Sequence, residues 1–100
     1  MFWIAAVPGG WGPWNAAGNG EMQAIVDELK AEVERRNDAV FDSLQAIEYA
    51  SQVVAGMNYL IKVSARLDKV DSEVVYLQLS VFQDLDGNLI LTGADPIGKF

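Results

Sequence analysis

The sequence contains no cysteine and no histidine. Without cysteine, the chain can form no disulfide and has no thiolate for nucleophilic chemistry. Without histidine, it lacks the commonest general base and the commonest metal ligand. Zinc sites are built from these two residue types, so a structural zinc is excluded and we expect no cofactor.

Basic residues are also scarce. Seven Lys and Arg residues stand against 14 Asp and Glu, which gives a net charge of −7. Proteins that bind nucleic acid neutralise phosphates with a basic surface, and an anionic membrane surface attracts the same residues. We therefore expect neither nucleic acid nor membrane as a partner.

The apolar run at residues 1–7 is too short to span a bilayer and lacks the basic flank of a signal peptide. The missing cysteines point the same way, because small secreted domains usually carry disulfides. These features favour a cytoplasmic location, with secretion as the alternative.

The chain has 100 residues, of which 51% are hydrophobic. This length suits a single domain with one core, which we expect to span residues 1–100. Residues 1–18 hold all three tryptophans and show no periodicity. They predict a partly irregular N-terminal arm.

One amphipathic helix follows the arm. Apolar residues recur at helical spacing at five positions, namely Met22, Ile25, Val26, Leu29 and Val33. Asn19 is a candidate N-cap, and Asn37-Asp38 is the expected stop.

From about Ser43 the pattern changes to a period of two, which is typical of strands. Four strands are expected. In the first three, one face carries Ile47, Tyr49 and Val53; Tyr59, Ile61 and Val63; and Val75, Leu77, Leu79 and Val81, and the fourth is the segment 89–92. We expect a loop at residues 65–73 and a tight turn at residues 86–88. No helical pattern separates the strands, so the fold class is α+β, with an antiparallel sheet wrapped around one long helix.

No catalytic constellation is apparent, so we expect that the protein is not an enzyme. The spacing Asp84-x-Asp86-x-Asn88 has the start of a calcium loop but lacks its glycine and its bidentate glutamate. Val53-Val54 is unusual at a hairpin tip, because turns favour Gly, Asn, Asp and Pro. By pattern alone, these valines indicate either the end of a strand or a binding surface, with local strain as a further reading.

Residues 52–63, QVVAGMNYLIKV, resemble the central signature of the stefins (type 1 cystatins), which are disulfide-free inhibitors of cysteine proteases. The segments 7–10, VPGG, and 79–85, LSVFQDL, resemble two further family motifs. The resemblance extends over essentially the whole chain and implies the cystatin fold. In that fold, a fifth short strand lies in the arm just before the helix.

The resemblance implies reversible, non-covalent, tight-binding inhibition of papain-like cysteine proteases of the cathepsin type. Three segments would enter the active-site cleft. The implied contact residues are Val7, Pro8 and the pivot Gly9 in the arm; Gln52, Val53, Val54, Ala55 and Gly56 in the first hairpin; and Leu85 and Asp86 in the second. Gly10 is an alternative pivot, and Asp86 stands where the family commonly has proline.

One alternative function remains at this stage. The chain could be a cystatin-fold binding module or scaffold that recognises a non-protease partner through the same loops. In solution we expect a monomer that can also form a domain-swapped dimer, because a strained hairpin tip relaxes when the hairpin opens.

Overall fold

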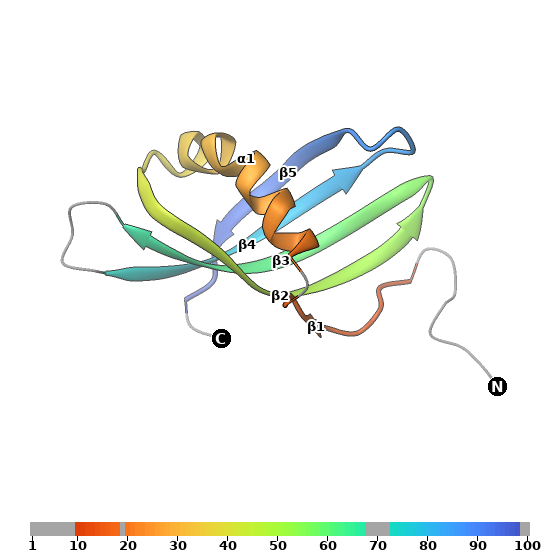
Figure 1. The fold of residues 1–100 in the computed structure, drawn as a ribbon, viewed down its shortest axis with the longest axis horizontal. Helices are drawn as coiled ribbons and strands as arrows, with labels where there is room; N and C mark the ends of the chain where they lie inside the picture. Colours follow the sequence, from red (N-terminus) through yellow and green to blue (C-terminus); the bar gives the residue numbers. More distant parts are fainter. Residues whose placement is uncertain (1–9, 19, 68–72, 99–100) are drawn as a thin grey trace.

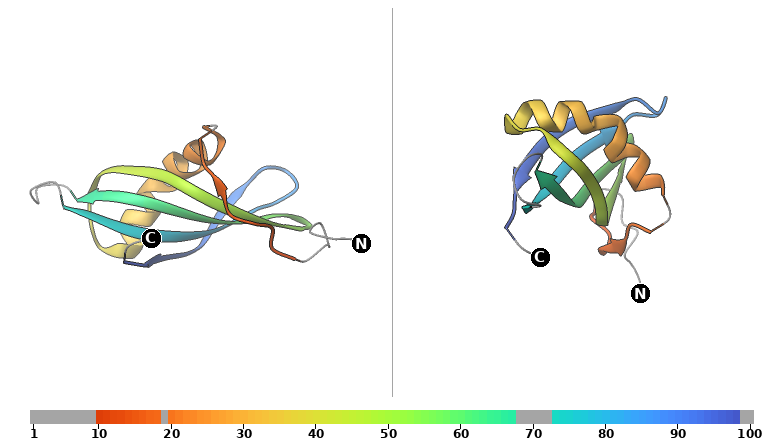
Figure 2. Two further views of the ribbon diagram at one scale, coloured as in Figure 1. Left: turned by 90° about the horizontal axis from the view of Figure 1, so that it is seen from below. Right: turned by 60° about the vertical axis from the view of Figure 1, so that its left-hand side comes forward.

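The computed structural model describes residues 10–18, 20–67 and 73–98. The elements in chain order are β1 (Asn15–Ala16), α1 (Glu21–Asn37), β2 (Phe41–Val54), β3 (Gly56–Leu67), β4 (Val74–Gln83) and β5 (Leu89–Pro96). The strands form one sheet in the order β1-β2-β3-β4-β5, and every neighbouring pair is antiparallel. The helix lies across one face of the sheet (Figures 1 and 2). The predicted fold is confirmed, and β1 is the fifth strand that the resemblance implied.

The helix α1 is buried along the predicted apolar stripe: all five residues of that stripe are buried. It begins after Gly20, whose φ of 85° is left-handed and which makes no side-chain capping hydrogen bond. The predicted N-cap, Asn19, lies outside the described residues. The helix ends as predicted, because Asp38 adopts a left-handed φ of 50° and its N–H returns to the carbonyl of Arg35.

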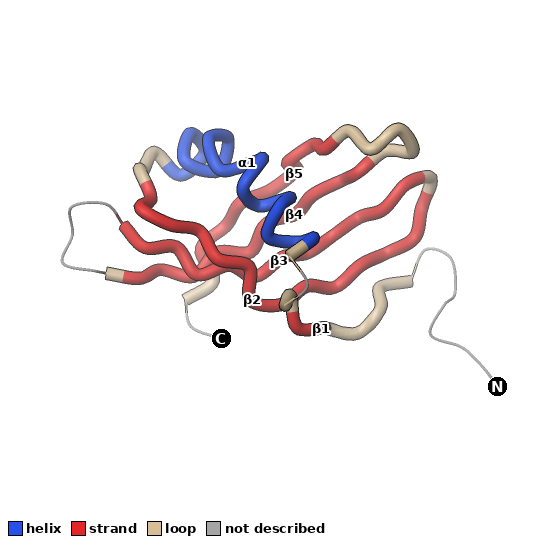
Figure 3. The backbone as a smooth tube through the Cα atoms, in the orientation of Figure 1, coloured by secondary structure: helices blue, strands red, loops and turns tan. Residues whose placement is uncertain are grey.

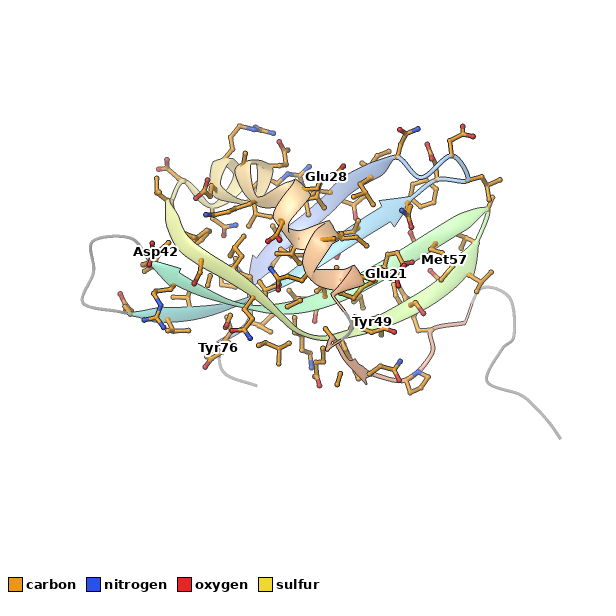
Figure 4. All side chains as sticks on the ribbon, in the orientation of Figure 1. Glu21, Glu28, Asp42, Tyr49, Met57 and Tyr76 are labelled. Carbon is orange, nitrogen blue, oxygen red and sulfur yellow. The ribbon has the colours of Figure 1, made fainter. Side chains whose placement is uncertain are left out.

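The core lies between α1 and the concave face of the sheet. Strand alternation places one set of side chains under the helix, as predicted: Tyr59, Ile61, Val63, Leu77, Leu79 and Val81. Figure 4 shows side chains between α1 and the sheet, and it labels Glu28, which lies on the exposed side of the helix. The helix and the sheet therefore form two layers around one hydrophobic core.

Two expectations about the strands are wrong. The loop predicted at residues 65–73 begins later, because β3 continues to Leu67 and Ala65 is fully buried between Leu44 and Val75. Ala65 extends the inward alternation of β3, so its small side chain is a core residue and not a loop residue. Ile47 also departs from the expected alternation, because the register of β2 shifts between Ala46 and Glu48, and Tyr49 packs against the core whereas Ile47 is not among the residues that do.

Side chains of α1 cover the two open edges of the sheet. On β2, the Gln23 amide donates to the carbonyl of Leu44 and accepts from the N–H of Ala46, both at 2.8 Å. On β5, the Arg36 guanidinium donates to the carbonyl of Leu91 at 2.6 Å. Unpaired strand edges attract other chains, and these bonds occupy edge groups of β2 and β5 on the two sides of α1, which crosses the sheet in Figure 3.

Candidate functional site

The first hairpin is the tight connection between β2 and β3. The pairs Gln52–Asn58, Val53–Met57 and Val54–Gly56 run to its end, and Ala55 alone forms the apex. The Asn58 side-chain amide donates to Oε1 of Gln52 at 2.8 Å, which ties the two strands together just behind the tip. The tip is therefore held by backbone and side-chain bonds before any partner arrives.

Gly56 makes this short turn with a φ of 117°, a value that L side chains rarely adopt. Among the described residues, Asp38 alone has a positive φ without being glycine. The strain expected at the tip valines is therefore absent from their φ angles, because the glycine takes the left-handed position.

The tip of the first hairpin is apolar and exposed. Val53 has 58% of its surface exposed and Val54 has 38%. The two valines are the last residues of β2, so they do finish a strand, and they also leave apolar surface exposed at its end.

The second hairpin joins β4 to β5 and is organised by Asp84. Its carboxylate accepts from the N–H groups of Asp86 and Asn88 at 2.9 and 2.8 Å, and from the Asn88 side-chain amide at 3.0 Å. These bonds, mainly those from Asn88, hold the pKa of Asp84 below its usual value. Asp84 is thus committed to the turn, and among the described residues no three acidic, His or Cys side chains gather as a metal site.

Leu85 lies at the end of the second hairpin with 82% of its surface exposed, and Asp86 beside it is also exposed. A second apolar side chain is therefore presented on a turn that its neighbours hold rigid. We name Val53, Val54, Ala55 and Leu85 together the tip surface.

The two hairpins are in contact. A Cβ atom added to Gly56 would lie 2.3 Å from the carbonyl oxygen of Gln83 and 3.2 Å from Cα of Asp84. Both turns point to the same end of the sheet, away from the β3–β4 end (Figure 1). The first hairpin therefore lies against the base of the second, and both tips are presented at the same end of the sheet.

The arm reaches the same end along the outer edge of β2. Trp11 forms an antiparallel bridge with Gln52, and the N–H of Gly12 donates to the carbonyl of Ser51 at 2.9 Å. The description begins at Gly10, so the predicted contacts Val7, Pro8 and Gly9 lie outside the described residues. The structure thus brings together the predicted residues of both hairpins and places the start of the described arm beside them.

Sequence reasoning missed three residues that shape this end of the molecule. Asp84 was considered as a calcium ligand, although an aspartate that opens a turn commonly bonds to the backbone two residues on. Gln83 receives the close approach of Gly56, and Trp11 docks on β2. Neither has a local sequence signal, because both contacts join segments that are distant in the chain.

The exposed side chains of the tip surface are aliphatic. Two carboxylates flank Leu85: that of Asp84 is held in turn hydrogen bonds, and Asp86 is exposed. Separately, no helix among residues 10–18, 20–67 and 73–98 has the length and hydrophobicity that crossing a bilayer requires.

Comparison with known proteins agrees with this geometry. The family model for the Cystatin domain matches residues 9–89. Cystatin-A of Homo sapiens is 42% identical over 76 residues, which cover 73% of this chain and 71% of the relative. Stefin-C of Bos taurus is 39% identical over 82 residues, covering 75% and 74%, and Cystatin-B of Sus scrofa is 40% identical over 65 residues, covering 65% and 60%. The matched region includes both hairpins and the arm from residue 9, and the chain belongs to the cystatin family.

Proposed function

We propose that this protein is a reversible, non-covalent inhibitor of papain-like cysteine proteases. The observation that carries the proposal is the tip surface, where two rigid hairpins in mutual contact present apolar side chains at one end of the sheet. A narrow apolar edge of this kind is suited to entering a concave cleft. Papain-like enzymes are the class that the stefin resemblance implies.

The binding energy would come from burial of the tip surface. Val53 and Leu85 are mostly exposed in the free protein, and burying side chains of this size contributes roughly 1.5–3 kcal/mol each. The Gln52–Asn58 bond and the Asp84 turn hold the hairpins before binding, so little conformational entropy is lost.

Each contact residue has a proposed role. Gln52 to Gly56 would occupy the centre of the cleft, while Val7 and Pro8 fill non-primed subsites and Gly9 turns the arm away from the catalytic cysteine. Leu85 and Asp86 would contact the primed side. The exposed charge of Asp86 would disfavour enzymes with an acidic rim at that position.

We also propose that residues 1–100 act as one cystatin domain, as a monomer in the cytoplasm, and without catalytic activity. The lack of cysteine fits a reducing compartment. The lack of histidine, and the commitment of Asp84 to its turn, fit a protein that binds an active site without supplying one.

The test is a panel of papain-like proteases assayed with the full chain. We expect competitive inhibition below micromolar concentration, full recovery of activity on dilution, and an inhibitor of unchanged mass after incubation. Absence of inhibition across the panel at micromolar protein would contradict the proposal and favour the alternative of a binding module with a non-protease partner.

Variants assign the effect to the proposed site. Val53→Ser and Leu85→Ser should each weaken inhibition at least tenfold, while Val40→Ser should leave it unchanged. Val40 is a matched control because it is 64% exposed and lies just before β2, at the end of that strand opposite the tip. Deletion of residues 1–8 should also weaken inhibition if the arm fills subsites, and equal inhibition by the shortened chain would remove the arm from the mechanism.

A further inference from the structure

The position of Trp11 supports one inference beyond the tip surface, and it rests on the proposed function. We infer that Trp11 is a further specificity-determining residue, whose indole contacts an apolar part of the protease rim on the non-primed side of the cleft.

The arm is attached to β2 at defined points. Trp11 pairs with Gln52, Gly12 donates to Ser51, and further along β1 pairs Asn15 with Tyr49. The first of these points is one residue before Val53. Trp11 is therefore fixed at the side of the tip surface.

The Trp11 side chain is available for contact. Residues directly opposite each other in an antiparallel pair project from the same face of the sheet, so Trp11 and Gln52 share a face. In the free protein Trp11 is 45% exposed, which leaves much of a large aromatic surface in water. Tryptophan is enriched among the residues that dominate binding energy at interfaces.

The direction of the arm assigns Trp11 to the non-primed side. Leu85 lies on the β4–β5 hairpin, whereas Trp11 lies on the other flank of the first hairpin, beyond β2. In the proposed mode, the second hairpin contacts the primed side and the arm enters the non-primed side. Trp11 would then meet the enzyme surface just outside the subsites that the preceding residues fill.

Trp14 is three residues away and has a different environment. Nζ of Lys62 lies 4.1 Å from the centroid of the Trp14 ring and 3.0 Å from the Glu48 carboxylate. Trp14 is 41% exposed, close to the value for Trp11, but its ring is engaged by a cation of β3. Trp14 therefore attaches the arm to the convex face of the sheet, while Trp11 remains open to a partner.

The two tryptophans form a matched pair for the experiment. Trp11→Ala should keep the unfolding midpoint and raise the inhibition constant about tenfold or more, mainly through faster dissociation. This loss should be largest for enzymes with an apolar non-primed rim and small for those with an acidic rim. Trp14→Ala should lower the unfolding midpoint and leave the inhibition constant of the folded protein nearly unchanged.

A spectroscopic readout reports the contact directly. In a Trp3→Phe/Trp14→Phe background labelled with 5-fluorotryptophan, the single ¹⁹F resonance should shift when papain with a carboxymethylated active-site cysteine is added, provided the background protein still binds it. An unchanged resonance, or an inhibition constant for Trp11→Ala equal to that of the wild type, would overturn the inference. If Trp11→Ala weakened inhibition of all enzymes equally, the role of Trp11 in specificity would be overturned. Failure of the wild-type protein to inhibit any enzyme would instead count against the proposed function.

Discussion

Gly56 faces the carbonyl oxygen of Gln83, and a Cβ atom at position 56 would lie 2.3 Å from that oxygen. No carbon atom can remain at that distance, so the contact between the two hairpins requires glycine. The φ of 117° at the same residue adds a second requirement for glycine. One residue thus sets both the turn of the first hairpin and its approach to the second.

Gly56→Ala should therefore separate the hairpins. We expect a loss of more than about 2 kcal/mol in the free energy of unfolding, because left-handed strain of about 1–2 kcal/mol is joined by the clash with Gln83. Inhibition should weaken at least tenfold. Denaturant unfolding and inhibition assays measure the two effects.

The control is Gly87→Ala. Gly87 has a φ of 89°, but a Cβ atom there would meet nothing within 4 Å. The Gly87→Ala variant should lose only about 1–2 kcal/mol of its free energy of unfolding, from backbone strain alone. If both variants lose the same stability and the same inhibition, the contact with Gln83 has no role of its own.

Gln23→Ala tests the closure of the β2 edge. The substitution removes two hydrogen bonds of 2.8 Å to Leu44 and Ala46, and we expect the free energy of unfolding to fall by about 1–3 kcal/mol. Alanine favours helix more than glutamine does, so helix propensity alone would act in the opposite direction. Gln45→Ala, at an exposed position of β2, should change stability little, and an equal loss there would contradict the edge-closing role.

Asp84→Ala should give a stability difference that depends on pH. The folded protein lowers the pKa of Asp84 below its ordinary value of 3.8, so the ionised carboxylate stabilises the fold above that value. As the pH falls, the unfolded state protonates first and the folded state protonates as the pH passes through the lowered pKa, so this contribution is lost. The gap in melting temperature between wild type and variant should be largest near neutral pH and shrink below about pH 4.

Asp86→Ala removes a carboxylate from the same turn and serves as the control for that measurement. Asp86 is exposed, and its contribution to the turn is its backbone N–H, which the substitution retains. The difference in melting temperature between Asp86→Ala and the wild type should stay small at every pH. A gap for Asp84→Ala that is constant with pH would show that the carboxylate does not organise the turn.

Domain swapping stays a prediction. Its expected hinge is now Gly56, because this glycine and not the tip valines has the left-handed φ. If the first hairpin opened, α1 and β2 of one molecule could pack against the sheet of another. Gly56→Ala should raise the dimer fraction, because an extended hinge relieves both the left-handed φ and the contact with Gln83. Size-exclusion chromatography after prolonged warming near the unfolding midpoint would show this, and monomer alone in both proteins would refute it.

The sequence by itself determined the parts that depend on local pattern. The apolar stripe from Met22 to Val33 required a helix with one buried face, and the alternation in residues 59–63 and 75–81 required strands against it. The signature at residues 52–63 located the first hairpin and its family. These features could be read because side-chain periodicity follows directly from backbone geometry.

Only the tertiary structure decided the contacts that join distant segments. Gly56 against Gln83, Gln23 along the β2 edge and Trp11 beside Gln52 each involve residues more than 20 positions apart. Their existence depends on strand register and on how the helix crosses the sheet, which no local pattern encodes. The end of β3 at Leu67 was missed for the same reason, since pairing with the neighbouring strands β2 and β4 keeps residues 65–67 in the sheet.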